Sequence, residues 1–350
     1  HLAMQTYIII VHLAFPAAGI ASTSVAAVIF HASMLLFAVS YVRCIIADPG
    51  GIPDDPVWKP ASAQCEQTGP LAVEKKRDGT RRFCRKENKF KPDRSHYSDE
   101  DGRNVLKMDH YCHWMAGTVG HRNYKFFFLS ILYATVCSLM SSGVCAHLLL
   151  SGSLPGVQTA YLALHQILGL TVTCAVTPFF MFHSFLLSKN LTTIEFMKAR
   201  DEHLEWALGH KIRPQRWWQT HSNFDNGLFS NLRDALGANP LLWLLPVGGP
   251  AGNGLTFIAN QGDVLTMPPL ERGRNIFQAD PEQEDVAYDL FEDDPNASAV
   301  SEVGSGFCMF FGDMALGATI VLSRALGRSS PDVRALASLG FDASLARRAA

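Results

Sequence analysis

The run Phe126–Leu150, FFFLSILYATVCSLMSSGVCAHLLL, contains no Lys, Arg, Asp or Glu. A helix needs roughly 20 predominantly apolar residues to cross a bilayer, so this run is long enough to do so. A comparable segment follows at Tyr161–Leu187, and the whole stretch from Phe126 to Ser188 lacks charged side chains. Residues 126–188 are therefore predicted to form two membrane helices joined by a short turn.

Two more apolar segments lie near the start of the chain, at Tyr7–Ile20 and Val25–Ile46. The first is short and contains Pro16, which a membrane helix tolerates better than a soluble one. The predicted fold is thus an all-α membrane protein, with helices 1 and 2 in residues 1–46 and helices 3 and 4 in residues 126–188. The alternative, buried helices of a large soluble protein, is disfavoured because such long charge-free runs are rare there.

The composition agrees with membrane spans joined by soluble loops. The 350 residues are 48% hydrophobic and only 18% charged, compared with about 25% charged in ordinary soluble domains. A net charge of −2 gives no reason to expect a nucleic-acid partner. The eight cysteines show no CxxC pair, which argues against a disulfide scaffold and favours a reducing compartment.

The distribution of Lys and Arg predicts how the chain is oriented in the membrane. Residues 47–125 are rich in both, and the chain is basic again after Ser188, whereas the turn Ser151–Thr159 contains neither. Basic loops remain on the cytosolic side. The loop between helices 2 and 3 and the C-terminal part are therefore expected to be cytosolic in a multi-pass integral membrane protein.

Three residues of this loop form a candidate reactive centre: Asp109, His110 and Cys112. The thiolate is the reactive form of cysteine, and a free thiol titrates near pH 8.5. Activation of the thiol therefore needs a neighbouring cation or base. His110 is the candidate base, and Asp109 can fix the tautomer of its imidazole. A structural cysteine in a hydrogen-bonded turn is the alternative interpretation.

Several motifs, in order along residues 1–262, resemble the DHHC protein S-acyltransferases. Asp48-Pro49-Gly50 follows the second span like the DPG motif of that family, and Thr192-Thr193-Ile194-Glu195 follows the fourth span like its TTxE motif. The segment from Asn231 to Pro246 resembles its C-terminal conserved segment. The cysteine-rich domain is matched by Arg82-Phe83-Cys84, Lys91–His96, Leu106–Trp114, Val119-Gly120 and Asn123–Phe127.

The resemblance implies a two-step acyl transfer, with palmitoyl-CoA as the expected co-substrate. Cys112 would take the acyl group, and a cysteine of a substrate protein would then receive it. His110 is implied as the base and Asp109 as its partner. Thr193 is implied to hold Asp109, and Asn231 to brace the C-terminal segment against the catalytic loop. The acyl chain is expected to lie between the membrane helices, because each buried CH₂ contributes about 0.8 kcal/mol.

The chain departs from the family pattern at its zinc-binding positions. Typical members hold two structural zinc ions in this loop, each with three Cys and one His. Of the matching positions only Cys84 remains a ligand of that kind; the others are Glu87, Tyr97, Ser98, Asp101, Asn104, Tyr111 and Thr118. Structural zinc needs four Cys or His ligands, so no metal site is expected. In this respect the chain is similar to fungal members that carry DHYC.

Without zinc, other interactions must hold the loop. Exposed ion pairs contribute only about 0–1 kcal/mol each, so aromatic packing is the favoured hypothesis. It would involve Phe83, Phe90, Tyr97, Tyr111 and Trp114.

The remaining predictions concern the C-terminal part and the partners. Residues 189–262 are expected to be a cytosolic segment, and residues 263–350 an acidic, disordered tail of unassigned role. Expected partners are acyl-CoA, membrane lipid and proteins with a cysteine near an endomembrane or the plasma membrane. A catalytically weak adaptor is the first alternative. A small transporter is the second; it is disfavoured because the spans hold no Asp, Glu or Lys, and their only Arg, Arg43, lies near the end of Val25–Ile46.

Overall fold

A computed structural model describes residues 2–60, 74, 81–152, 154–207 and 222–259. The chain divides into two compact units. Among the described residues, the first unit contains those within 2–50, 121–188 and 228–253, and the second contains those within 51–120, 189–227 and 254–259. The tail predicted over residues 263–350 lies outside the described residues.

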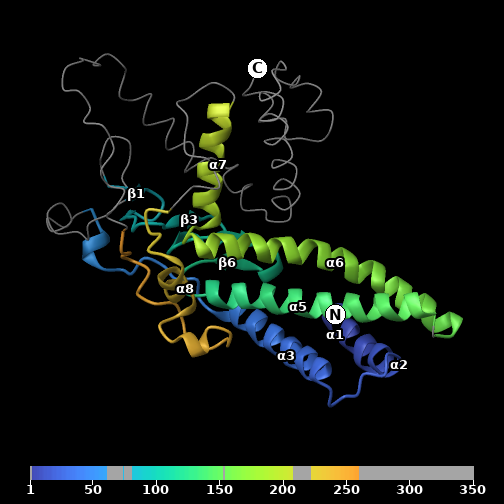
Figure 1. The fold of residues 1–350 in the computed structure, drawn as a ribbon. Helices are drawn as coiled ribbons and strands as arrows, with labels where there is room; N and C mark the ends of the chain where they lie inside the picture. Colours follow the sequence, from blue (N-terminus) through green and yellow to red (C-terminus); the bar gives the residue numbers. More distant parts are fainter. Residues whose placement is uncertain (1, 61–73, 75–80, 153, 208–221, 260–350) are drawn as a thin grey trace. The chain divides into compact units, whose positions relative to one another are not determined.

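The first unit is helical, and three of its helices are long and apolar enough to cross a membrane. These are α3 (Val25–Ile46), α5 (Tyr124–Ser151) and α6 (Gly156–Ser188). In Figure 1, α5 lies between α3 and α6, and both neighbours pack along it. This confirms a mostly helical protein with candidate membrane spans.

The segment predicted as the first span forms three short helical pieces. Its residues form α1 (Leu2–Ile9), a π-helical segment η1 (Ile10–Ala14) and α2 (Phe15–Ala17). Pro16 cannot donate a helical hydrogen bond, and this helical stretch ends within two residues of it. A fourth spanning helix therefore remains a prediction.

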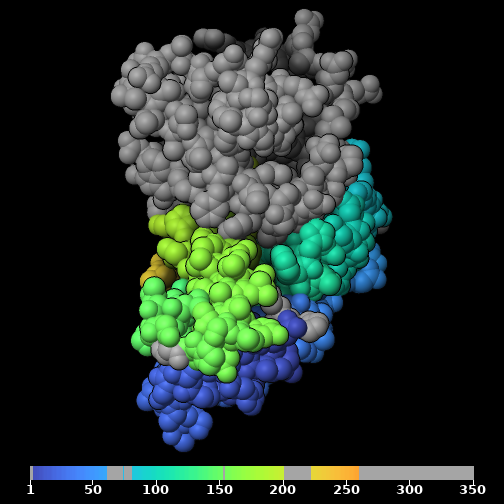
Figure 2. Space-filling view, turned by 90° about the vertical axis from the view of Figure 1, so that its right-hand side faces the viewer, coloured from blue at the N-terminus to red at the C-terminus, as the bar shows by residue number. Residues whose placement is uncertain are grey.

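Apolar side chains from η1, α2, α3, α5 and α6 form a core of the first unit. Phe30 of α3 packs edge-to-face on Phe15 at 5.4 Å between ring centroids, and both side chains are buried. Cys145 and Leu148 of α5 and Leu162 of α6 belong to the same core. Figure 2 views the end of the unit where α5 finishes and α6 begins, with the green atoms of these helices against the blue N-terminal segment.

Hydrogen bonds tether α5 to the segment that follows α8 (Leu228–Leu236) and includes η5 (Pro240–Leu242). The Lys125 ammonium group donates to the Leu242 carbonyl at 2.9 Å and to the Val247 carbonyl at 2.7 Å. Lys125 is 1% exposed, so these bonds satisfy a buried cation. The Tyr133 hydroxyl donates to the Leu244 carbonyl in the same segment.

The second unit contains three antiparallel hairpins of short strands. They pair β1 (Phe83–Cys84) with β2 (Lys89–Phe90), β3 (His96–Ser98) with β4 (Arg103–Val105), and β5 (His110–Cys112) with β6 (Gly117–Val119). The other helical elements among the described residues of this unit are the short turns η2 (Pro56–Trp58) and η3 (His113–Met115) and the longer helix α7 (Thr193–Ala207). The all-α prediction therefore needs correction here. Strands this short leave no long alternating pattern in the sequence.

The aromatic packing expected in this unit is only partly present. Phe83 and Phe90 pack edge-to-face at 5.2 Å between ring centroids. Trp58 and Leu106 are buried in a small apolar cluster. Trp114, however, is 75% exposed, so its predicted role in packing is wrong.

We expect Lys125→Met to lower the thermal midpoint of the protein in detergent, measured by intrinsic fluorescence. The substitution keeps the length of the side chain but removes two charge-assisted hydrogen bonds, each contributing about 1.5–3 kcal/mol. Lys59→Met is the matched control, because the ion pair of Lys59 with Asp54 is largely solvated. Equal shifts for the two variants would contradict the tether.

Candidate active site

The strand β5 explains why His110 and Cys112 lie together. Alternate side chains of a strand point to the same face, so residues two apart share a side. His110 and Cys112 are 3% and 2% exposed, whereas Tyr111 between them is less buried. The partner strand β6 fixes the register, and the Asp109 amide extends the ladder by donating to the Val119 carbonyl at 2.9 Å.

Asp109 and His110 form a buried ion pair. The distance between Asp109 Oδ2 and His110 Nδ1 is 2.6 Å, and Asp109 is 1% exposed. A carboxylate can only accept a hydrogen bond, so Nδ1 must carry the hydrogen. Nε2 is then the nitrogen that can exchange a proton with the Cys112 thiol, whose pKa the imidazole lowers.

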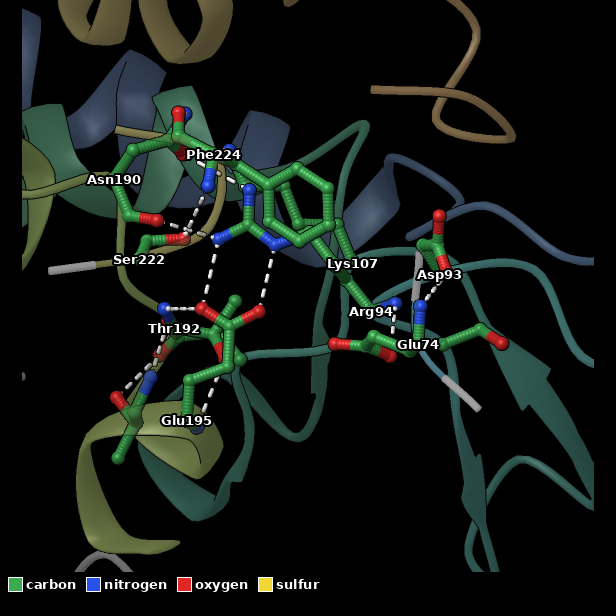
Figure 3. Close-up of polar contacts among 12 residues, drawn as sticks. Glu74, Asp93, Arg94, Lys107, Asn190, Thr192, Glu195, Ser222 and Phe224 are labelled. Carbon is green, nitrogen blue, oxygen red and sulfur yellow. Dashed lines mark hydrogen bonds and ion pairs between the residues drawn. The ribbon is translucent and has the colours of Figure 1, made fainter. Parts of the chain in front are cut away.

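The start of α7 is a capping box. The Thr192 hydroxyl accepts a hydrogen bond from the Glu195 amide at 3.2 Å, and the Glu195 carboxylate accepts one from the Thr192 amide at 2.9 Å. These reciprocal bonds satisfy amides that a helix leaves without partners at its first turn. Thr192 and Glu195 therefore fix where the helix begins (Figure 3).

Thr193, the first residue of α7, binds the carboxylate of Asp109. Its amide donates to Oδ1 at 3.0 Å, and its hydroxyl donates to Oδ2 at 2.7 Å. The positive end of the helix dipole favours an anion at this position. The carboxylate therefore stays ionised although it is buried, and its orientation toward His110 is fixed.

Charge stabilisation links the pKa values of His110 and Cys112. Burial opposes the imidazolium, but hydrogen bonds with Asp109 and Cys112 and the attraction of their negative charges raise the pKa of His110 to about 9. Burial also opposes the thiolate, yet the hydrogen bond and positive charge of His110 lower the pKa of Cys112. Both shifts favour the thiolate–imidazolium pair over the neutral thiol and imidazole.

Two backbone amides contribute to the same effect and were missed by the sequence analysis. The amides of Met115 and Trp114, in the short turn η3 after Cys112, donate toward the thiol and lower its pKa. Backbone groups leave no signal in residue types. Only a predicted turn directly after the cysteine could have indicated them.

The other histidine of the matched motif, His96, does not have the properties of a second base. Burial and the positive charges of Arg82, Lys91 and Lys198 hold its pKa well below the usual range. It is therefore neutral at physiological pH.

The remaining motif residues belong to the first unit. The Gly50 amide donates to Asp48 Oδ1 at 2.7 Å, and the Arg122 amide donates to the Pro49 carbonyl at 3.1 Å. Gly50 has a φ of +101°, which other residues rarely adopt, so the glycine is required for this turn. Asn231 of α8 is buried and donates to the Ser188 carbonyl at the end of α6 at 2.8 Å. Its bracing of the catalytic loop stays a prediction.

Comparisons with known proteins agree with this geometry. The family model for the DHHC palmitoyltransferases matches residues 77–200. Probable protein S-acyltransferase 15 of Arabidopsis thaliana is 32% identical over 229 residues, 61% of this chain and 80% of the relative. Palmitoyltransferase PFA3 of Candida albicans and palmitoyltransferase ZDHHC15 of Rattus norvegicus are each 30% identical. The alignments cover 56% and 51% of this chain, and about half of those two relatives, at 53% and 51% of their lengths.

We expect Asp109→Asn to reduce the reactivity of Cys112 toward a small thiol reagent at pH 7. The amide carries no negative charge, so the pKa of His110 falls, less imidazolium is present to stabilise the thiolate, and the pKa of Cys112 rises. The labelling rate at pH 7 should therefore fall on the order of tenfold, and the rate profile should move to higher pH.

The rate is measured as labelling of Cys112, with a Cys112→Ala background subtracted. Asp99→Asn, which removes a half-exposed carboxylate from the same unit, is the control and should leave the rate unchanged. An unchanged profile in Asp109→Asn would disprove the charge coupling.

Proposed function

Because the chain belongs to the DHHC palmitoyltransferase family, we propose that it carries a long-chain acyl group from acyl-CoA to cysteines of other proteins through an acyl-Cys112 intermediate. Palmitoyl is the proposed acyl group. The observation that carries the proposal is the buried sequence of contacts from Thr193 through Asp109 and His110 to Cys112. It supplies the nucleophile, the proton carrier and the group that orients the proton carrier.

In the first step the Cys112 thiolate attacks the thioester carbonyl of acyl-CoA. The new carbon–sulfur bond joins the acyl group to Cys112, and the bond between the acyl carbon and the CoA sulfur breaks. The departing thiolate takes the proton from His110 Nε2 and leaves as free CoA. His110 is then neutral, and its Nδ1–H still donates a hydrogen bond to Asp109 Oδ2.

In the second step the neutral imidazole accepts the proton of a substrate cysteine. The resulting thiolate attacks the acyl-Cys112 thioester, the acyl group moves to the substrate protein, and the Cys112 thiolate leaves. The thiolate–imidazolium pair is thereby restored. One histidine performs both proton transfers, so no second base is needed.

The proposal places the reaction at a membrane surface. Four spans, with the catalytic loop and the C-terminal part on the cytosolic side of an endomembrane or the plasma membrane, agree with the basic loop and the three long apolar helices. Acyl-CoA can then insert its chain among the helices. Proteins that carry a cysteine close to the membrane are the proposed acceptors. An inactive adaptor is disfavoured, because a complete reactive centre gives it no advantage.

We further propose that the loop folds without zinc, since the residues at the family's zinc positions do not fit the metal. Glu87 Oε2 accepts hydrogen bonds from the Asn104 amide and from Asn104 Nδ2, both at 2.6 Å. The Asn104 amide and the Glu87 carboxylate are already hydrogen-bonded to each other, and neither is a good replacement for the thiolates that bind structural zinc. Asn104 is completely buried, so these bonds form in a dry environment.

A second set of these positions is also joined by hydrogen bonds. The Ser98 and Thr118 hydroxyls are buried and lie 3.0 Å apart, and the Asp101 amide donates to Ser98 Oγ at 3.1 Å. The bond from Ser98 to Thr118 links strand β3 to strand β6. Neutral side chains thus connect the hairpins at the positions where relatives bind zinc.

The zinc proposal predicts that purified protein contains far less than one zinc per chain, measured by mass spectrometry of the metal content. Treatment with a strong chelator should leave the thermal midpoint unchanged. Stoichiometric zinc, or a midpoint that falls on chelation, would contradict the proposal.

The acyl transfer proposal predicts an acyl-enzyme. Purified protein mixed with palmitoyl-CoA should gain one palmitoyl group that hydroxylamine removes, detected as intact mass. Cys112→Ala should gain none, because it lacks the attacking sulfur. His110→Gln should be acylated at least about a hundredfold more slowly, because general acid–base catalysis is lost.

Cys84→Ala is the matched control, since it removes another buried cysteine from the same unit. Folded wild-type protein that never gains the acyl group, or equal labelling of Cys112→Ala, would overturn the proposed function.

A further inference from the structure

Among the residues that the structure describes, Arg94 is the largest completely buried side chain, and the two acyl-transfer steps do not use it. Its guanidinium group forms a bidentate ion pair, or fork, with Glu195: Nε donates to Oε1 at 2.7 Å, and Nη2 donates to Oε2 at 2.9 Å. It also donates to both oxygens of Asn190, from Nη1 to Oδ1 at 3.0 Å and from Nη2 to the carbonyl at 2.7 Å. Figure 3 shows these bonds converging on one side chain.

The partners of the guanidinium group define the start of α7. Glu195 is the capping-box residue whose other interaction is with the Thr192 amide, and Asn190 lies just before the helix. Arg94 therefore holds the chain on both sides of Thr192 and Thr193. A fork of fixed geometry sets both position and direction, which a point charge cannot do.

The backbone of Arg94 is hydrogen-bonded to the residues that lead into the catalytic strand, β5, which carries His110 and Cys112. Its carbonyl accepts a hydrogen bond from the Met108 amide at 3.1 Å, one residue before Asp109. Its own amide donates to Glu74 Oε2 at 2.9 Å, and its φ of +62° lies in the left-handed region. A non-glycine residue keeps that conformation only where its surroundings enforce it.

Two aromatic rings complete the enclosure. The guanidinium carbon lies 4.9 Å from the centroid of the Phe224 ring and 5.2 Å from that of Phe257. These faces attract the cation and exclude water, which strengthens its hydrogen bonds. A buried charge held in this way has few alternative positions.

We propose that Arg94 is a positioning residue for acyl transfer: it joins the catalytic strand to the start of α7 and so keeps Thr193 on the carboxylate of Asp109. The backbone of Arg94 holds the residues next to Asp109, and its side chain holds the start of α7, which carries Thr193. The inference rests on the proposed function and deepens it. It also assigns to Glu195 a second role, as the acceptor through which Arg94 acts.

A double-mutant cycle tests the proposal with purified full-length protein and palmitoyl-CoA. Arg94→Lys keeps the charge but loses the fork, and it should lower the maximal rate of acyl-enzyme formation about tenfold, as other positioning groups do. The palmitoyl-CoA concentration that gives half the maximal rate should stay the same. In a Thr193→Ala background the hydroxyl bond to Asp109 is already lost and only the amide bond remains. Arg94 then has less of the contact to maintain, so the same substitution should lower the rate by clearly less than about tenfold.

Lys86→Gln serves as the control, because it breaks an ion pair of the same unit that involves Asp99 rather than α7. It should leave the rate unchanged. Rates are compared per folded protein, by the monodisperse fraction and the thermal midpoint. If Arg94→Lys does not fold, Glu195→Gln replaces it in the cycle, since the amide keeps the shape but weakens the fork.

Three outcomes would overturn the proposal. The first is a tenfold loss that is equally large in the Thr193→Ala background, which would indicate a general structural role. The second is a raised half-saturating concentration at an unchanged maximal rate, which would indicate binding of acyl-CoA. The third is a wild-type rate in folded Arg94→Lys. An absence of acyl-enzyme in the wild type would instead overturn the proposed function, and it is read from a separate arm of the experiment.

Discussion

The buried carboxylate of Asp109 is the constraint on which the reactive centre depends. A charge that is 1% exposed is stable only if hydrogen bonds replace its water, and here Thr193 and His110 provide them. The same carboxylate fixes the imidazole and raises its pKa, so the thiolate gains a cationic neighbour. Removing any one of these contacts leaves the buried charge with fewer hydrogen bonds to replace its water. Stability and reactivity are therefore coupled at this site.

One short motif at the start of α7 performs two tasks. Thr192 and Glu195 bond to each other as a capping box, which any soluble helix could use. The capped helix then presents the amide and hydroxyl of Thr193 to a residue 84 positions earlier in the chain. A local interaction thus creates the donor for a distant one.

The sequence predicted the long apolar helices and the reactive residues, because both have strong local signals. The charge-free runs indicated the spans α3, α5 and α6, and adjacency indicated the pairing of Asp109 with His110. The three hairpins were missed because strands of two or three residues show no periodicity. The role of Arg94 was hidden for a different reason. Its partners Asn190 and Glu195 lie about a hundred residues away, 96 and 101 positions along the chain, and a basic residue in a basic loop looks exposed.

The central claim is that Asp109 keeps His110 protonated beside Cys112, and the protonation state of His110 tests it most directly. Histidine-selective ¹³C labelling would report the titration of its imidazole by nuclear magnetic resonance, with the resonance assigned by its loss in His110→Gln. The account predicts an imidazolium that persists through neutral pH and titrates with a pKa of about 9. A pKa at or below the ordinary value of about 6.5 would contradict it.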